Sequence, residues 1–358
     1  MEKEALSKNL LQVDREKVLI EQLRDGLEMA RVVAEHRERY LVAHAELVLQ
    51  SEITGQLRFA AQAREDFPAV GDWVGISVMD DDFAIIHQVL PRYSTLKRKA
   101  VAKFGQSQII ATNIDYAFIV QAVGHDFNLA RLERYLTICH SARIDPIVIL
   151  TKIDLIDQVE LASLYQHISS RIQSISIVAV SNVTGEGLDQ IRQLIQPGYT
   201  YCFLGSSGVG KSTIINHLKG SAILKTAAIS SATDKGRHTT SHRELVPLAG
   251  GSYVIDTPGM REVGVTDDQT GIQVTYEKIL DFASKCKFSD CSHTSETGCA
   301  VLLAIEQGEI SESTYHNFQK LQRETARFSA NAREIREKGR QQGKLYKRIQ
   351  KERRKNKY

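Results

Sequence analysis

The pattern of apolar and polar positions divides the N-terminal part of the chain into two segments. Residues 1–31 are rich in charged side chains, and Leu19, Leu23 and Leu27 recur at four-residue spacing. This spacing predicts a helix up to about residue 35, with one face packed on its neighbour. From residue 32 to residue 105, short apolar stretches alternate with turn residues. That pattern predicts a small β-barrel or sandwich. We expect a five-stranded barrel of the OB-fold kind, which is a common RNA-binding scaffold of this size.

The pattern changes again at residue 106. Apolar runs such as YAFIVQAV, DPIVIL and SISIVAVS alternate with amphipathic stretches such as LARLERYLTICHSA. Strands that alternate with helices predict a mostly parallel α/β sheet, here over residues 106–270. We expect a small helical domain with a cysteine cluster over residues 271–330, and a basic helical tail over residues 331–358.

Composition indicates a folded protein. Hydrophobic residues make up 42% of the 358 residues and charged residues 25%, near the averages of globular proteins, which excludes wholesale disorder. No apolar run reaches the roughly 18 residues that span a bilayer, and the charged start lacks the apolar segment of a secretory signal. We therefore expect a soluble cytoplasmic protein without a membrane partner.

The strongest motif follows the predicted strand YTYCFL and opens a predicted helix. It reads G-x-x-x-x-G-K-S, the pattern of a phosphate-binding loop in the context that this loop requires. Backbone N–H groups and the helix N-terminus bind phosphate oxygens, Lys211 reaches the β- and γ-phosphates, and Ser212 binds Mg²⁺. An ordinary glycine turn is the alternative, but it does not explain the Lys-Ser-Thr sequence. The expected contacts are Gly205, Ser206, Ser207, Gly208, Val209, Gly210, Lys211, Ser212 and Thr213.

A second acidic motif, D-T-P-G, ends the predicted strand SYVID about 45 residues after the phosphate loop. Asp256 is placed to hold a metal-bound water, and the Gly259 N–H to meet the γ-phosphate. By itself the motif is also typical of a simple turn, but its position after a phosphate loop favours the nucleotide site.

Two further loops predict that the base is guanine. The motif Thr151-Lys152-Ile153-Asp154 follows the strand PIVIL, at the strand end where α/β sheets bind ligands. Asp154 can accept hydrogen bonds from N1–H and the exocyclic amine of guanine, a donor pair that adenine lacks. Lys152 would lay its aliphatic stem on the base. Ser181 and Asn182 end the next strand, where backbone N–H groups could meet guanine O6.

A cluster of cysteines and one histidine has the spacing of a metal site, C-x₄-C-x-H-x₅-C. Three thiolates and one imidazole complete a tetrahedral Zn²⁺ site with no open position, which indicates one structural zinc. Coincidental thiols are the alternative, but Cys139 and Cys202 fall in apparent core elements. His316 is a less favoured fourth ligand. The expected ligands are Cys286, Cys291, His293 and Cys299.

Charge is distributed unevenly along the chain. Residues 331–358 contain twelve Lys or Arg and three Glu, an excess of +9 within a total of +3, so the preceding residues carry a net −6. RNA phosphate is the natural partner of such a tail, bound through shape and backbone. A second basic segment runs from Arg92 to Lys103 and contains no acidic residue. It either meets phosphate or forms a solvated surface; its cations are Arg92, Lys97, Arg98, Lys99 and Lys103.

The order of these motifs along the chain resembles that of a known group of proteins. In the translation-factor-related GTPases, which these motifs resemble, the phosphate loop comes before the base-binding loops, whereas here T-K-I-D and V-S-N come first. This order resembles a circularly permuted GTPase. Together with the barrel sequence G-D-W-V, the loop G-R-H-T-T, D-T-P-G-M-R-E and the cysteine cluster, it closely resembles the bacterial small ribosomal subunit biogenesis GTPases called RsgA, YjeQ or YloQ. The resemblance covers about residues 32–330.

This resemblance implies an activity and its partners. The family hydrolyses GTP to GDP under stimulation by the small (30S) ribosomal subunit, late in its maturation. The barrel and the tail would contact 16S rRNA, and the protein would be a monomer off the ribosome. In the GTP-bound state Thr240 would join Ser212 as a ligand of Mg²⁺, with Thr239 behind it.

Two positions depart from related patterns. Thr151 stands where family members commonly have Asn, which helps to bind the base and brace the phosphate loop, so we expect a different nucleotide affinity. Met260 stands where Ras-like enzymes carry a water-orienting Gln, so the attacking water needs another partner. His238 is the candidate, since an imidazole beside the switch threonine can orient water; a merely structural histidine is the alternative.

Two other functions are compatible with parts of the sequence. An ATP-dependent P-loop kinase would need a second substrate pocket, and Asp154 argues against ATP. An RNA-binding scaffold with a non-hydrolysing GTP site is the non-enzymatic alternative, and the intact Lys211, Ser212 and Asp256 argue against it.

Overall fold

The computed structural model describes most of the chain. The described residues are 15, 17–36, 39–99, 107–172, 174–219, 243–256 and 269–330, without the side chains of Lys99 and Asp256. The sites expected at His238, Thr239, Thr240 and Gly259, and the basic tail, lie outside these residues.

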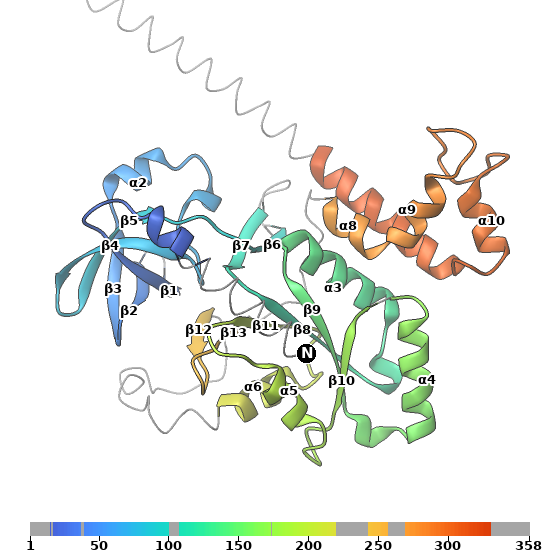
Figure 1. Cartoon of the computed structure of the whole chain (residues 1–358), viewed down its shortest axis with the longest axis horizontal. Helices are drawn as coiled ribbons and strands as arrows, with labels where there is room; N and C mark the ends of the chain where they lie inside the picture. Colours follow the sequence, from blue (N-terminus) through green and yellow to red (C-terminus); the bar gives the residue numbers. More distant parts are fainter. Residues whose placement is uncertain are drawn as a thin grey trace, which may run out of the picture. The chain divides into compact units, whose positions relative to one another are not determined.

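Two compact units make up the chain (Figure 1). The first comprises Met1–Lys97 and Ile109–Glu262, and the second Arg98–Gln108 and Val263–Tyr358. No helix in the described ranges is both long and apolar enough to cross a membrane.

The first unit begins with the predicted five-stranded barrel, which the structure confirms. The strands pair in the order β1-β2-β3-β5-β4, and β1 pairs with β4 to close the barrel. Strands β3 and β5 are parallel, and the short helix α2 (Gly55–Ala60) lies between β3 and β4 in the sequence. Alternate side chains of each strand point inward and form the barrel core. The strands are β1 (Glu28–His36), β2 (Arg39–His44), β3 (Leu47–Ile53), β4 (Trp73–Asp80) and β5 (Phe83–Val89).

The helix predicted up to residue 35 is wrong in its C-terminal part. The described helical residues end at Glu21, and β1 begins at Glu28. Ala30 and Val32, two positions apart on β1, are buried in the barrel core, which suits a strand that faces this core. The leucine repeat still packs on its neighbour, since Leu23 and Leu27 contact the barrel strand at Gly75.

A mostly parallel sheet forms the second part of the first unit, as predicted. Its strand order is β10-β9-β8-β11-β13, and β12 pairs with β13 in the antiparallel direction. The strands are β8 (Tyr116–Ala122), β9 (Asp145–Thr151), β10 (Ser176–Val180), β11 (Thr200–Leu204), β12 (Glu244–Pro247) and β13 (Tyr253–Asp256). Apolar side chains fill both faces of the central strands, so these strands appear in the sequence as continuous apolar runs.

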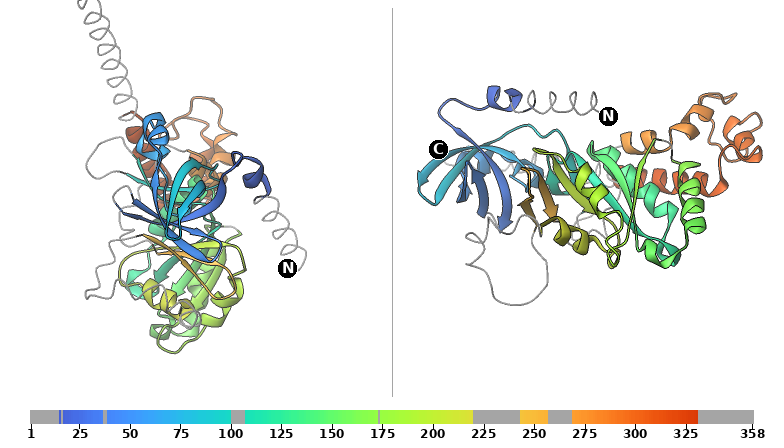
Figure 2. Two further views of the ribbon diagram at one scale, coloured as in Figure 1. Left: turned by 90° about the vertical axis from the view of Figure 1, so that its left-hand side faces the viewer. Right: turned by 60° about the horizontal axis from the view of Figure 1, so that its bottom comes forward.

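Helices cover the two faces of this sheet (Figure 2). Apolar residues of α5 and α6 join those of β8, β9, β10 and β11 in one core cluster. Helix α3 packs on β8 and β9. The helices are α3 (Leu129–Ala142), α4 (Gln158–Ser169), α5 (Leu188–Leu194) and α6 (Lys211–Lys219).

The barrel and the parallel sheet are joined by strand pairing. β1 of the barrel pairs with β12 at Ala34 and Glu244, which makes one continuous sheet of eleven strands. A separate two-stranded sheet is formed by β6 (Thr95–Lys99) and β7 (Ser107–Thr112).

The second unit is mainly helical over its described residues 269–330. It contains α8 (Thr270–Thr275), α9 (Glu277–Ala283) and α10 (Ala300–Glu306), and residues 312–330 are also helical. The Tyr276 and Phe318 rings pack with their centroids 5.4 Å apart and tie α9 to the last helix. The cysteine cluster lies in the connection between α9 and α10.

Candidate functional site

The phosphate-loop motif forms a tight turn between β11 and α6. Gly205, Gly208 and Gly210 all have positive φ, the region that favours glycine. A Cβ on Gly205 would lie 2.3 Å from the Val120 carbonyl oxygen, so the close approach of β8 also requires glycine. The Lys211 Nζ donates to the carbonyl oxygens of Gly205 (2.8 Å) and Ser206 (2.5 Å), which holds the ammonium group over the loop. Ser212 and Thr213 are exposed in the first turn of α6.

Thr151 braces the phosphate loop from β9. Its hydroxyl donates to the carbonyl oxygen of Val209 at 2.7 Å and lies 3.3 Å from that of Gln121. The Thr151 side chain is completely buried. The bracing role expected of an Asn at this position is therefore performed by the threonine.

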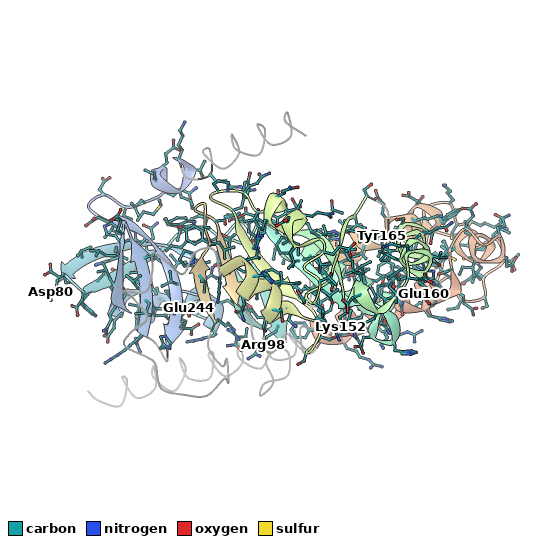
Figure 3. All side chains as sticks on the ribbon, turned by 90° about the horizontal axis from the view of Figure 1, so that it is seen from below. Asp80, Arg98, Lys152, Glu160, Tyr165 and Glu244 are labelled. Carbon is teal, nitrogen blue, oxygen red and sulfur yellow. The ribbon has the colours of Figure 1, made fainter. Side chains whose placement is uncertain are left out.

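Asp154 is held by the loop that follows β10. The Ser181 hydroxyl donates to the Asp154 carboxylate at 2.5 Å and accepts the N–H groups of Val183 and Thr184 at 3.1 Å each. This network fixes one carboxylate oxygen. Lys152 has a left-handed backbone conformation and a half-exposed side chain, whose ammonium is 3.9 Å from Asp126 (Figure 3).

Asn182 links the second base loop to the phosphate loop. Its side-chain amide donates to the Gly210 carbonyl at 3.3 Å, and a Cβ on Gly210 would collide with that amide at 2.4 Å. The Asn182 Oδ1 is buried without a hydrogen-bond partner in the described structure. Three motifs that are far apart in the sequence thus meet around one loop: Thr151 to Asp154, Ser181 with Asn182, and Gly205 to Ser212.

The D-T-P-G motif is described only at its first residue. Asp256 ends β13, and the pairing of Cys202 with Ile255 places it beside the strand that runs into Gly205. On the other side, Asp256 pairs with Glu244, which is labelled in Figure 3.

The four expected zinc ligands form one cluster in the second unit. Their ligand atoms all lie within 4.8 Å of one another, and His316 is not among them. The Nδ1 of His293 is 3.5 Å from the Cys286 Sγ and 3.4 Å from the Cys299 Sγ, and the two Sγ atoms are 3.9 Å apart. Thiolates about 2.3 Å from a central zinc stand about 3.8 Å apart at the corners of a tetrahedron. The spacing therefore fits a tetrahedral zinc site.

Local contacts keep this cluster in shape. The Cys299 Sγ accepts the Leu302 N–H at 3.5 Å and so caps α10. The Tyr315 hydroxyl donates to the His293 carbonyl at 2.6 Å, which ties the ligand loop to the last helix. The Glu296 carboxylate accepts N–H groups of Ser292 and Thr294. The loop is therefore organised by the chain itself around the four ligands.

Arg92 corrects the interpretation of the basic segment. Its guanidinium forms a bidentate pair with Asp72 at 2.6 and 2.7 Å and donates to the carbonyls of Glu65 and Phe67. Asp72 is completely buried, and a buried carboxylate requires such a cation. Lys97 pairs with Glu65 at 2.7 Å. Arg92 is therefore a structural residue and does not present its charge to RNA.

A polar junction that was not expected from the sequence lies between the barrel and the parallel sheet. Arg31 of β1 is 5% exposed and donates to groups on Asn113 and Thr200. Nearby, Asp115 accepts the Thr200 N–H and pairs with Arg15. Burial raises the pKa of the Asp115 carboxyl, although these donors oppose the shift. No local pattern signals the junction, because its partners are 82 and 169 residues from Arg31 in the sequence.

Known proteins share this architecture. A model of the RsgA GTPase family matches residues 89–266. The chain is 42% identical over 311 residues to a small ribosomal subunit biogenesis GTPase, RsgA 2, of Lactiplantibacillus plantarum, and the match covers 87% of each chain. It is 38% identical over 307 residues to the RsgA of Opitutus terrae, with 83% of each covered.

Solved structures agree in fold. The crystal structure of YjeQ from Thermotoga maritima matches with a TM-score of 0.61 and 26% identity, over 82% of this chain and 97% of that one. YloQ, described as a circularly permuted GTPase, matches with a TM-score of 0.61 and 23% identity, over 84% of this chain and 96% of that one. The predicted fold, a circularly permuted P-loop GTPase domain behind a β-barrel, is thereby confirmed. With this fold, and with relatives that match over most of its length, the chain belongs to the RsgA GTPase family.

Proposed function

We propose that this chain binds the small ribosomal subunit and hydrolyses GTP in a subunit-stimulated manner during late maturation of that subunit. The observation that carries the proposal is the direct bonding of both base-binding loops to the phosphate loop, through Thr151 to Val209 and Asn182 to Gly210. These bonds fix the base-binding loops relative to the phosphate loop, so they would also fix a bound base relative to its phosphates. The small ribosomal subunit is proposed as the partner because the relatives are named small ribosomal subunit biogenesis GTPases.

The residues around the phosphate loop suit guanine nucleotides. Asp154 keeps an acceptor for the guanine N1–H and amine, since Ser181 occupies only one of its oxygens. Lys211 and the loop amides would bind the phosphates and stabilise the charge that develops on them. The exposed Ser212 hydroxyl and Thr240 would hold Mg²⁺, which neutralises charge on the β- and γ-phosphates when bound. Asp256, one strand from the phosphate loop, would hold a metal-bound water, and Gly259 would meet the γ-phosphate.

His238 is proposed to orient the attacking water, because Met260 follows D-T-P-G where a glutamine would otherwise serve. Replacement by alanine should lower subunit-stimulated turnover and leave GTP affinity unchanged. Unchanged stimulated turnover with unchanged affinity would remove the histidine from the mechanism.

The cysteine cluster is proposed to hold one structural zinc. The tetrahedral spacing and the backbone N–H donated to Cys299 support this. Zinc would fix the connection between α9 and α10 and leave no open position for chemistry.

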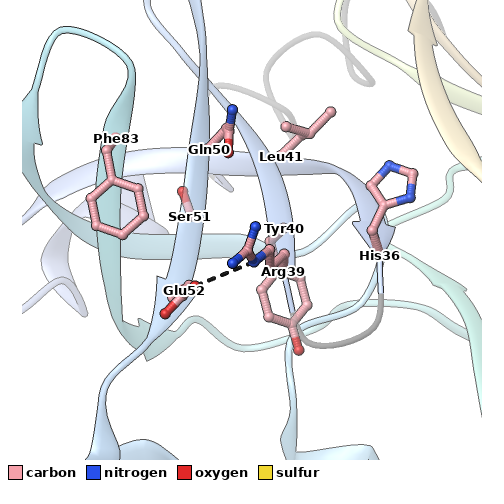
Figure 4. A pocket seen from close by; sticks show the side chains of 8 residues that line it. All are labelled: His36, Arg39, Tyr40, Leu41, Gln50, Ser51, Glu52 and Phe83. Carbon is pink, nitrogen blue, oxygen red and sulfur yellow. Dashed lines mark ion pairs between the residues drawn. The ribbon is translucent and has the colours of Figure 1, made fainter. Parts of the chain in front are cut away.

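The barrel offers a surface for 16S rRNA. A hollow of about 390 Å³ on β2, β3 and β5 is lined by Phe83, Gln50 and Arg39, whose guanidinium is 3.4 Å from Glu52 (Figure 4). Arg39 is 74% exposed, so this surface ion pair is weak and the guanidinium is free to meet phosphate. The Ser51 hydroxyl, also in the hollow, is buried without a described hydrogen-bond partner. We assign rRNA contact to this face and to the basic tail, and expect a cytoplasmic monomer off the ribosome.

The decisive experiment compares GTP and ATP hydrolysis by the full chain, with and without purified small subunits. We expect slow GTP turnover alone, faster turnover with subunits, and no comparable ATP turnover. Lys211→Ala should abolish GTP turnover, whereas Lys219→Ala at the far end of α6 should not. Failure of subunits to stimulate the wild type would overturn the ribosomal role. Equal turnover of ATP would overturn guanine selection and favour a kinase-like enzyme.

A further inference from the structure

A buried arginine stands where the barrel meets the parallel sheet. The Arg31 Nη2 donates to the Thr200 hydroxyl at 2.7 Å and to the Asn113 carbonyl at 3.2 Å. Its Nε is 3.4 Å from the Gly71 carbonyl. The guanidinium also lies 5.1 Å from the ring centres of Trp73 and Tyr253. A planar fork that meets three acceptors and two rings cannot be replaced by the point charge of lysine.

No carboxylate shares a described hydrogen bond with Arg31. Asp72 is engaged by Arg92 and by the Thr112 hydroxyl. Asp115 accepts from Arg15, from the Thr200 N–H and from Tyr93. The cation is thus held by directional contacts to groups on both sides of the junction, so its geometry depends on the relative position of barrel and sheet.

The partners of Arg31 lie at the start of the two strands that lead to the nucleotide. Thr200 is the first residue of β11, which runs directly into Gly205. Tyr253 is the first residue of β13, which ends at Asp256. Thr200 and Tyr253 are paired in register. One barrel side chain therefore contacts both strands, each of which carries a phosphate-site motif at its other end.

Strand pairing gives a second connection between the barrel and β13, at the end of β13 that lies opposite Tyr253. Ala34, three residues after Arg31 on β1, pairs with Glu244, and Glu244 pairs with Asp256. Neighbouring strands lie about 4.8 Å apart, so the barrel backbone at Ala34 is about 10 Å from that of Asp256. β1 and β13 are both antiparallel to β12 and thus run in the same direction.

We propose that Arg31 is a positioning residue that couples the barrel to the nucleotide site, so that contact of the barrel with the small subunit shifts β11 and β13 and raises GTP turnover. The proposal rests on the proposed function, because it concerns how the subunit stimulates the enzyme. A close-packed interface transmits small displacements, since it has no free volume to absorb them. The same contacts transmit displacements in both directions, so we expect the bound nucleotide to alter the barrel strand as well.

Two substitutions test the coupling in the full chain. Arg31→Lys keeps the charge and removes the fork, and Thr200→Val removes the hydroxyl that accepts from it. Thr200→Ser restores this acceptor, and Arg192→Lys makes the same exchange at an exposed arginine of α5. The measurements are subunit affinity, basal kcat and KM for GTP, and kcat with saturating subunits.

We expect the fold-stimulation by subunits to fall about tenfold in Arg31→Lys and Thr200→Val, which lies within usual coupling energies. Subunit affinity, basal kcat and KM should stay within about twofold of the wild type, and Thr200→Ser and Arg192→Lys should behave like the wild type. Unchanged stimulation, or an equal loss of basal and stimulated turnover, would overturn the proposal, since the second result describes a merely structural residue.

Amide hydrogen exchange provides a readout that does not need the ribosome. Exchange of the β1 amides should differ between the complexes with GDP and with a non-hydrolysable GTP analogue in the wild type, and this difference should disappear in Arg31→Lys. If subunits fail to stimulate the wild type, the proposed function fails while this measurement still decides the coupling. Identical β1 exchange in both wild-type complexes would overturn it.

Discussion

At the residue scale, buried polar groups organise this protein. The examples are Thr151, Asp72 and Arg31. The Thr151 hydroxyl holds a carbonyl of the phosphate loop, Asp72 receives a bidentate arginine, and Arg31 joins two domains. Each makes its contact where it is buried, and loss of a partner there leaves a polar group unsatisfied. We therefore expect small substitutions at these residues to have large effects.

Thr151→Val tests the bracing of the phosphate loop. Valine keeps the shape but leaves the Val209 carbonyl without its donor, at a cost of about 1–3 kcal/mol. GDP affinity, measured by titration with a fluorescent analogue, should fall by about tenfold, since 1.4 kcal/mol corresponds to a factor of ten. Thr151→Ser retains the hydroxyl and should bind like the wild type. Equal affinity of the valine and serine variants would contradict the role of the hydroxyl.

His140 predicts how stability depends on pH. Burial lowers the pKa of this imidazole on α3, although Asp145 opposes the shift. The unfolded chain, with a histidine pKa of about 6.5, then binds the proton more readily than the folded chain, so stability falls as the pH drops below that value towards the folded pKa. The midpoint of urea unfolding should therefore fall less in His140→Gln than in the wild type between about pH 7.5 and pH 5.5. Parallel loss in both proteins would refute the prediction.

At the element scale, the two connections that carry the expected binding sites are organised by a few specific side chains. The turn from β11 to α6 depends on glycines and on the lysine that folds back over it, and the connection from α9 to α10 depends on the cysteine cluster. Too few apolar residues lie in this second connection to hold it by packing alone. A zinc ion bound to the four side chains would add to the stabilisation that the hydrogen bonds of this connection provide.

Zinc removal tests that statement. Cys291→Ser removes one ligand, so the purified protein should lose bound zinc, and proteases should cleave the connection between α9 and α10 faster. Basal GTP turnover should change little, because the ligands lie in the second unit. Cys139→Ser, in α3, is the control that should keep the zinc. Full zinc content in the Cys291 variant would show that this cysteine is not a ligand.

At the scale of the whole molecule, charge is separated along the chain. The tail carries +9, whereas the preceding residues carry a net −6. An acidic body would be repelled by RNA, so we expect the tail to supply most of the electrostatic attraction to the subunit. Arg92, whose charge is neutralised within the barrel, contributes nothing to it.

Removal of residues 331–358 should weaken subunit binding and flatten its dependence on salt. Each phosphate contact contributes to the slope of log affinity against log salt, so loss of twelve cations should reduce that slope clearly. Basal GTP hydrolysis should persist, since the phosphate loop is untouched. A truncated protein with the same salt slope as the full chain would show that the tail does not bind the RNA.

The sequence by itself determined the local features of this protein. The phosphate loop, the strands around it and the zinc ligand spacing are read from neighbouring residues, because turn geometry, strand alternation and ligand spacing are short-range properties. The prediction from local pattern was wrong at β1. A leucine repeat suggested a helix there, but these residues form a strand that closes the barrel.

Only the tertiary structure decided which charged side chains are paired inside the protein, and that the barrel is joined to the parallel sheet. Arg92 meets Asp72 twenty residues away, and Arg31 meets Thr200 169 residues away. Such partners are chosen by burial: a charge removed from water is tolerated only where the fold supplies acceptors around it. Composition and spacing do not contain that information, since it depends on which strands become neighbours.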